Sequence, residues 1–213
     1  PEAWSLRWYR NMIGDCSAEV VSSTVPCSTK WMKGTINSFY IGIIATFIAT
    51  VLGTMAALGL SRPHMPYKAL IMSILISPMI VPLIITAAGM FFFYARINLV
   101  YTFTGVILAH VALATPFVVI TVTATLVGFD MNMVKAAQSL GAKPMRTFFK
   151  VIMPLILPGI ISGALFAFIT SFDEVVIVMF MASIDQLTIP KQMWAGIRQE
   201  ISPVILCMAT CLV

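Results

Sequence analysis

The chain contains 213 residues, of which 60% are hydrophobic and only 10% are charged. A soluble domain carries about 25% charged residues and about 45–50% apolar ones. This composition and the mean hydropathy of +0.98 exclude a soluble enzyme, a disordered chain and a nucleic-acid-binding domain, and they indicate a polytopic membrane protein. The net charge of +5 does not point to nucleic acid, because the charged residues lie in short loops between apolar stretches.

Residues 1–33 precede the first apolar run, and their acidic and basic residues are nearly balanced. We expect this segment to lie outside the cell membrane. It has neither a Met start nor a signal-peptide pattern, so we expect a longer chain whose first spanning helix precedes Pro1. Cys16 and Cys27 both fall here, where oxidation is possible; a disulfide between them is a hypothesis, and two free thiols are the alternative.

Four long apolar runs follow, at 36–60, 68–94, 99–127 and 156–182. Each reaches the length of about 20 residues that a spanning helix needs. A fifth run, 201–213, stops after about half a span. These runs are too long and too uniform for the alternating strands of an outer-membrane barrel. We therefore predict an all-α, polytopic transmembrane helix bundle, with residues 34–213 forming a single membrane domain.

The distribution of Lys and Arg among the loops predicts the orientation of the bundle. Loop 128–150 carries four basic residues against one acidic residue, and loop 61–68 carries two basic residues and none that is acidic. The intervening loops, 95–98 and 183–200, have a single basic residue or balanced charge. Because basic residues accumulate on the cytoplasmic side, loops 61–68 and 128–150 are expected to face the cytoplasm.

Prolines and small residues give the predicted spans their local character. Pro78 and Pro82 in the second span and Pro116 in the third each remove a backbone donor and predict a helix kink. Such kinks line cavities in some membrane proteins and are merely tolerated in others. A row of small residues in the first span predicts close helix packing, with a dedicated dimer seam as the alternative: Ala45, Ala49, Gly53 and Ala57.

Three further residues in the spans are best read as packing residues. His110 in the third span is interpreted as hydrogen-bonded to a neighbouring helix, with proton transfer as the alternative. Cys207 and Cys211 are four residues apart in the last run, so they share one helix face and are interpreted as apolar packing residues.

Asp173 and Glu174 are the most informative polar residues, because they interrupt an apolar run that is otherwise free of charge. A carboxylate at mid-bilayer costs roughly 2.5–3.5 kcal/mol on insertion scales. Pairing with a basic group of another helix or subunit would offset that cost, but the predicted spans contain no internal Lys or Arg. We therefore expect one or both acids, with the preceding Phe172, to line a polar translocation path, with pairing to a basic group as the alternative. Adjacent helix residues point about 100° apart, so the two acids cannot face one pore equally.

The cytoplasmic loop 128–154 is amphipathic and basic. Four residues are expected to form a short apolar face: Val134, Ala137, Leu140 and Gly141. Lys143 and Pro144 then break the helix, and the chain is expected to re-enter the membrane at Pro154. Such a helix either rests on anionic lipid headgroups or receives a cytoplasmic partner.

The same loop resembles the signature of permease subunits of binding-protein-dependent ABC importers. That signature reads Glu-Ala-Ala, three residues, Gly, nine residues, Ile, one residue, Leu-Pro. The matching positions here are Lys135, Ala136, Ala137, Gly141, Val151, Met153 and Pro154. Lys135 stands where the family has an acidic residue. The resemblance implies that this segment, which includes Ser139, forms a coupling helix docked on an ATPase subunit, with Ala136, Ala137 and Gly141 allowing close approach.

Three other stretches look like spermidine/putrescine-type permeases: SLRWYRNMI, SFDEVVIVMF and LTIPKQMWAGIRQEISPVI. The resemblance implies the type I importer permease fold, with five of six helices here and the last incomplete. It further implies a multi-pass protein of the bacterial inner membrane, two ATPase subunits, a second and non-identical permease subunit, and a periplasmic solute-binding protein. It also implies a small cationic substrate such as putrescine or spermidine, which would explain Asp173 and Glu174.

The chain has no Gly-x-x-x-x-Gly-Lys-Ser/Thr motif, so we expect it not to be an enzyme. ATP and Mg²⁺ would then be bound by the partner ATPase, and this chain is expected to bind no cofactor and no metal. One alternative is a permease for another solute, such as an amino acid, another amine or a metal chelate. A second is a proton-coupled carrier that uses Asp173, Glu174 and His110. An intramembrane enzyme is disfavoured, because no supporting Ser/His pair or metal-binding spacing is present.

Overall fold

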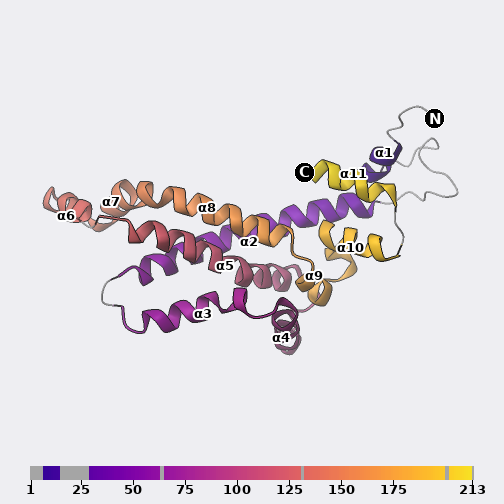
Figure 1. Cartoon of the computed structure of the whole chain (residues 1–213), viewed down its shortest axis with the longest axis horizontal. Helices are drawn as coiled ribbons and strands as arrows, with labels where there is room; N and C mark the ends of the chain where they lie inside the picture. Colours follow the sequence, from indigo (N-terminus) through magenta and orange to yellow (C-terminus); the bar gives the residue numbers. More distant parts are fainter. Residues whose placement is uncertain (1–6, 15–28, 63–64, 131, 200–201, 213) are drawn as a thin grey trace. The chain divides into compact units, whose positions relative to one another are not determined.

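The computed structural model describes residues 7–14, 29–62, 65–130, 132–199 and 202–212. Within these ranges all regular structure is helical (Figure 1). Cys16 and Cys27 lie outside the described residues. The elements in chain order are α1 (Arg7–Ile13), α2 (Lys30–Leu60), α3 (Lys68–Ile80), α4 (Leu83–Arg96), α5 (Phe103–Val127), α6 (Asn132–Ser139), α7 (Pro144–Thr147), the π-helical turn η1 (Phe148–Ile152), α8 (Met153–Phe172), α9 (Val176–Met181), the 3₁₀ turn η2 (Ile184–Gln186), α10 (Ile189–Gln199) and α11 (Pro203–Leu212).

The chain divides into two compact units, which are described separately. Unit 1 comprises Pro1–Ile41, Ala87–Val106 and Phe172–Val213, and unit 2 comprises Gly42–Thr86 and Ile107–Ser171. The boundaries fall inside α2, α4 and α5 and at the end of α8. This division by contacts does not decide whether residues 34–213 form a single membrane domain, which stays a prediction.

Three helical stretches of the described chain are long and apolar enough to cross a membrane: Lys30–Leu60, Phe103–Val127 and Pro144–Phe172. Helices α3 and α4 together are also long and apolar enough, but they are bent by 103° at the break between them, as in a broken span or a re-entrant loop. The predicted span 68–94 is therefore interrupted, because Val81 adopts an extended conformation (φ −71°, ψ 134°) directly before Pro82. Pro78 lies inside α3, and Pro116 lies inside α5, which continues through it as one helix.

Unit 2 is held together by close contact of α5 with α2 and with α8. In α2, Ala45, Ala49 and Ala57 are fully buried. A Cβ atom added to Gly53 would lie 2.7 Å from Cβ of Val118, so the α2 and α5 backbones approach closely. The row of small residues is thus used for packing within the chain, as the bundle interpretation predicted.

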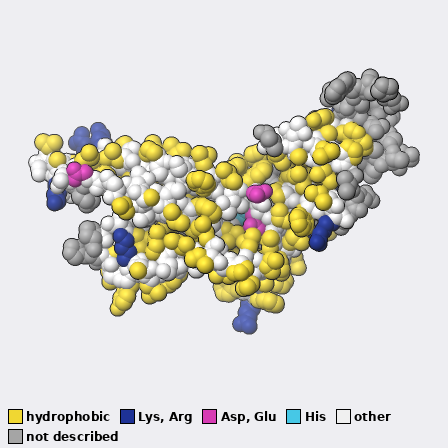
Figure 2. All heavy atoms as spheres, in the orientation of Figure 1, with side chains coloured by type: hydrophobic (Ala, Val, Ile, Leu, Met, Phe, Trp, Pro, Cys, Tyr) yellow, Lys and Arg dark blue, Asp and Glu magenta, His cyan; other side chains and the backbone are white. Residues whose placement is uncertain are grey.

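Large apolar side chains cover the outer faces of the unit 2 helices, where Phe47 is 69% exposed and Leu165 is 59% exposed. Figure 2 shows the same predominance of hydrophobic side chains along the visible face, while Lys and Arg gather near α6 and α7. Exposed apolar surface on this scale is expected where lipid or another membrane subunit covers a helix.

Unit 1 has a core that joins α1, the start of α2, α10 and α11. Its buried members are Trp31, Ile189, Val204, Ile205 and Met208, and Trp8, Met12 and Met193 pack against them. The loop before α10 is fixed to α2, because Asn37 Nδ2 donates to the carbonyls of Asp185 (2.8 Å) and Leu187 (3.0 Å). Cys207 is buried in α11 and Cys211 is exposed, and both thiols are free.

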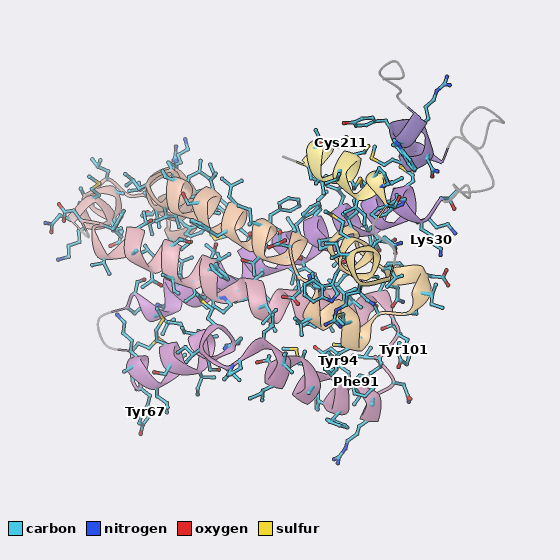
Figure 3. All side chains as sticks on the ribbon, turned by 45° about the vertical axis from the view of Figure 1, so that its right-hand side comes forward. Lys30, Tyr67, Phe91, Tyr94, Tyr101 and Cys211 are labelled. Atoms are coloured by element: carbon cyan, nitrogen blue, oxygen red, sulfur yellow. The ribbon has the colours of Figure 1, made fainter. Side chains whose placement is uncertain are left out.

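Within the same unit, the loop after α4 is tied to the end of α9. The Tyr101 amide donates to the Met181 carbonyl (2.9 Å), and Gln186 Nε2 donates to the Tyr101 carbonyl (2.8 Å). The side chain of Tyr101 projects outward and is 59% exposed (Figure 3).

Candidate functional site

The candidate coupling segment consists of α6, the turn 140–143, α7 and η1. Helix α6 begins after Asp130, whose Oδ1 accepts a hydrogen bond from the Asn132 amide (2.9 Å) and so caps the first turn. Helix α6 packs against α7 and against η1. In Figure 1 these elements lie together at one end of α5 and α8.

Burial divides the faces of α6 differently from the sequence prediction. Val134 and Ala137 are half-buried and face the rest of the unit, as expected. Leu140, which was assigned to the same apolar face, lies beyond the helix end and is 89% exposed. It continues an exposed apolar row with Met133 and Ala136, because positions three and four apart share one side of a helix. We call these three residues the docking row.

The other signature positions on α6 are accounted for individually. Lys135 is exposed, and the hydroxyl of Ser139, also exposed, donates to the Lys135 carbonyl (3.0 Å). Lys143, Arg146 and Lys150 are exposed as well, so the segment presents several basic side chains in addition to the docking row. No partner is present in the structure, so the ATPase-docking role of these residues remains a prediction.

Gly141 ends α6 in a way that only glycine adopts without strain. Its φ is +78°, its amide donates to the Gln138 carbonyl (2.9 Å), and the Ala142 amide donates to the Ala137 carbonyl (3.0 Å). These two bonds form a Schellman motif with glycine at the left-handed position. No atom within 4 Å would meet a Cβ added here, so the backbone, rather than crowding within the chain, requires this glycine. The resemblance to the permease signature had implied a different role for Gly141, namely that it allows close approach of a partner.

The helical stretch that leads into α8 begins well before Pro154. Helical structure restarts at Pro144, the first residue of α7, and continues through η1 into α8. Pro154 thus lies within a helical stretch that runs without a break from Pro144 to Phe172, and the expected re-entry into the membrane at Pro154 stays a prediction. Pro144 provides the actual start, since proline is favoured at the first helical position.

The predicted acidic site lies at a helix end rather than inside a helix. Helix α8 ends at Phe172, and Asp173, Glu174 and Val175 form a non-helical break before α9. The predicted span 156–182 is thus wrong at its C-terminal end. Phe172 is half-buried and packs edge-on against Phe39, with ring centroids 5.3 Å apart.

The two acids have different environments in the break. Glu174 is buried, and its Oε1 accepts a hydrogen bond from the Ile177 amide (2.9 Å) at the start of α9. Burial, the largest influence, raises the pKa of the Glu174 carboxyl, and hydrogen bonds from the Ile177 and Val176 amides act in the opposite direction. Asp173 is exposed. Glu174 therefore satisfies a helix terminus, whereas Asp173 is accessible to a ligand.

His110 and Ser171 form a buried polar contact in unit 2. Sequence analysis predicted that His110 is hydrogen-bonded to a neighbouring helix but did not identify Ser171 as the partner. Nδ1 of His110 lies 2.8 Å from Oγ of Ser171 and links α5 to the last turn of α8. This confirms the interpretation of His110 as hydrogen-bonded to a neighbouring helix. No group of three or more His, Cys, Asp or Glu residues in the described part of the chain is arranged to hold a metal ion.

Apolar helices of spanning length, together with a segment of exposed basic side chains at one end of a helical unit, define a polytopic membrane protein. Residues 49–213 match the family model described as "Binding-protein-dependent transport system inner membrane component". The chain belongs to this family.

Relatives and a solved structure agree with that assignment. The chain is 29% identical to the spermidine/putrescine transport system permease protein PotC of Haemophilus influenzae, over 85% of this chain and 71% of the relative. It is also 29% identical to the putrescine transport system permease protein PotI of Escherichia coli, over 97% of this chain and 72% of the relative. A solved structure of the MetNI methionine ABC transporter in inward-facing conformations matches with a TM-score of 0.66. That match has 19% identity and covers 85% of this chain and 87% of that one. This likeness confirms the type I importer permease fold.

Proposed function

We propose that this chain is the membrane-spanning permease subunit of an ATP-driven importer that moves a polyamine, such as putrescine or spermidine, into the bacterial cell. A separate ATPase supplies the energy, and two copies of it serve this chain and a non-identical sister permease. A solute-binding protein delivers the substrate from the periplasmic side. The family, the fold and the two polyamine-permease relatives support this assignment.

The observation that carries the proposal is the exposed docking row on α6. Leu140 is 89% exposed and Met133 is 48% exposed, although both are apolar and lie in a strongly basic segment. Apolar side chains held out on a short helix are costly unless a partner covers them. A hydrophobic groove on an ATPase subunit would cover this row, and the surrounding Lys and Arg side chains would meet acids on its rim.

The substrate assignment has a second line of support in Asp173. Polyamines are flexible multivalent cations, and an exposed carboxylate attracts them electrostatically. The Glu174 carboxylate already accepts a hydrogen bond from the Ile177 amide, whereas Asp173 is exposed. Asp173 is therefore the acid that we assign to the translocation path. Phe172 and Glu174 would then position it.

The test is co-purification and uptake by the complete importer, with this chain co-expressed with its ATPase, sister permease and binding protein. Ala136→Trp should sharply reduce recovery of the ATPase and ATP-dependent putrescine uptake. Gln138→Trp is the matched control, because Gln138 is also exposed on α6 but lies on the opposite flank from the docking row. Equal ATPase recovery with the two variants would refute docking at this row, and uptake that needs no ATPase would refute the proposal.

A further inference from the structure

The helix that leads from the coupling segment into α8 is not uniform. Between α7 and α8 the five residues Phe148–Ile152 form a π-helical turn, in which the Met153 amide donates to the Phe148 carbonyl five positions earlier. Both flanking helices are α-helical. A single π turn holds one residue more than an α-helical path between the same ends. The residues before the turn therefore have a different rotation about the helix axis from the one that a continuous α-helix would give them.

Pro154 gives a physical reason for the π turn at this place. Inside an α-helix, a proline ring clashes with the carbonyl four residues earlier, which for Pro154 is that of Lys150. Lys150 lies within the π turn, and the wider turn displaces its carbonyl from the proline ring. The turn can widen here because Phe149 and Lys150 are exposed.

Pro158, one turn later, shows why position matters. It also lies inside α8, but the helix around it remains α-helical. Ile156 is fully buried, and Gly159 lies against Thr125 of α5, so packing holds the chain in α-helical geometry there. Of these two prolines, only Pro154 follows a π-helical turn.

The π turn matters for the coupling segment because α6 packs on it. Helix α6 is in contact with both α7 and η1, and it joins them through the short turn 140–143. If the π turn became α-helical with all its residues retained, the extra residue would become part of the α-helix. Helix α7 would then rotate by about 100° relative to α8, which is the rotation of one residue in an α-helix. Helix α6 would move with α7, and the docking row would turn away from its present direction.

We propose that Pro154 is a positioning residue: through the π turn that it maintains, it sets the direction in which α6 presents Met133, Ala136 and Leu140. The ATPase partner to which this row is presented rests on the proposed function. Pro154 acts through the helix register, and contact of its own side chain with the partner is not required.

The experiment combines a substitution with a one-residue deletion in the complete importer. Pro154→Ala should let the turn become α-helical and lower ATP-dependent polyamine uptake by about tenfold, a loss within the usual range of coupling energies between sites. Deleting Lys150 in the Pro154→Ala background removes the surplus residue and should restore uptake. Lys150→Ala measures how much uptake is lost with this charge alone, and the deletion variant is compared with it. Pro158→Ala controls for loss of a proline in the same helix and should transport normally.

A direct structural measurement separates this proposal from the proposed function. Spin labels at Gln138 on α6 and Leu165 on α8 are both on exposed positions of unit 2, so their distance reports the direction of α6. The distance should change with Pro154→Ala and return with the deletion. An unchanged distance, or a deletion that does not restore it, overturns the positioning role. If the distances change and return as expected but the importer without substitutions takes up no polyamine, the positioning role stands and the proposed function is overturned.

Discussion

Nδ1 of His110 lies 2.8 Å from the hydroxyl oxygen of Ser171, in the interior of unit 2. Ser171 is the last residue but one of α8, so this bond joins α5 to the place where α8 ends. The His110 side chain is 1% exposed, and its Nε2 atom has no hydrogen-bond partner. The contact therefore satisfies one of two buried imidazole nitrogens.

Removing this bond should destabilise the protein. Ser171→Ala leaves Nδ1 of His110 without its partner and should lower the free energy of unfolding by about 0.6 kcal/mol, and by no more than about 1.7 kcal/mol, the average and the maximum for hydrogen bonds between membrane helices. Thermal unfolding in detergent measures the change. Thr210→Ala is a suitable control, because that hydroxyl donates only to the Leu206 carbonyl of its own helix. A Ser171→Ala protein as stable as the control would show that the bond contributes nothing.

Gly163 of α8 makes a closer helix contact in the same unit. A Cβ atom added to Gly163 would collide with the hydroxyl of Thr121 and lie 3.0 Å from Cα of Val118, both on α5. Gly163→Ala should therefore force α5 and α8 apart and cost about 1–3 kcal/mol by overpacking. Combining it with Thr121→Ala should recover part of the loss, because the nearest obstructing atom is removed.

Gly59 provides the matched control for that substitution. It lies in α2 of the same unit, and nothing within 4 Å would meet an added Cβ. Gly59→Ala should leave stability unchanged or raise it by up to about 1 kcal/mol, since alanine favours helix more than glycine does. If both glycines tolerated substitution equally, the α5–α8 contact would not be as close as described.

Sequence patterns predicted the helical elements well where long apolar runs and basic loops occurred. The apolar runs at 36–60 and 99–127 coincide closely with α2 and α5 because nothing polar competes with helix formation there. The kink predicted at Pro82 is confirmed, because the chain bends by 103° there. The run containing Asp173 was predicted as one continuous span, although the chain breaks there as well. Hydropathy measures transfer into lipid and is insensitive to a break of one to three residues.

The candidate site was predictable in position but not in geometry. The signature located α6, yet it could not separate Ala136, which faces outward, from Ala137, which faces the unit. Nor could the adjacent acids be told apart, because Glu174 is occupied by a backbone amide only once α9 has formed. The π turn before Pro154 has no sequence pattern of its own; it depends on which neighbouring residues are buried.

Gly141 should be sensitive to substitution for a reason internal to the chain. Gly141→Ala places a Cβ on a residue with φ +78° and should destabilise the end of α6 by about 1–2 kcal/mol, whereas Gly141→Asn should cost less, since asparagine tolerates this conformation. Amide hydrogen exchange of α6 in the purified chain measures the effect without any partner. Equal protection of α6 in the two variants would show that backbone strain is not what selects glycine here.

Asp173 and Glu174 should respond differently to loss of charge. Asp173→Asn should leave thermal unfolding unchanged, because the side chain is exposed, but should weaken polyamine uptake by raising the substrate concentration needed for half-maximal transport. Glu174→Ala should lower the unfolding temperature, because the Ile177 amide loses its acceptor at the start of α9. The loss should be about 1 kcal/mol, as for other helix caps.

Glu174→Gln separates charge from hydrogen bonding at the second position. The amide oxygen can still accept from Ile177, so stability should largely recover relative to Glu174→Ala, and any remaining defect in uptake would report the charge itself. Uptake that is insensitive to Asp173→Asn but abolished by Glu174→Gln, in proteins that fold normally, would reverse the roles assigned to the two acids. Since Glu174 is buried and Asp173 exposed, we expect the effect on uptake to follow Asp173.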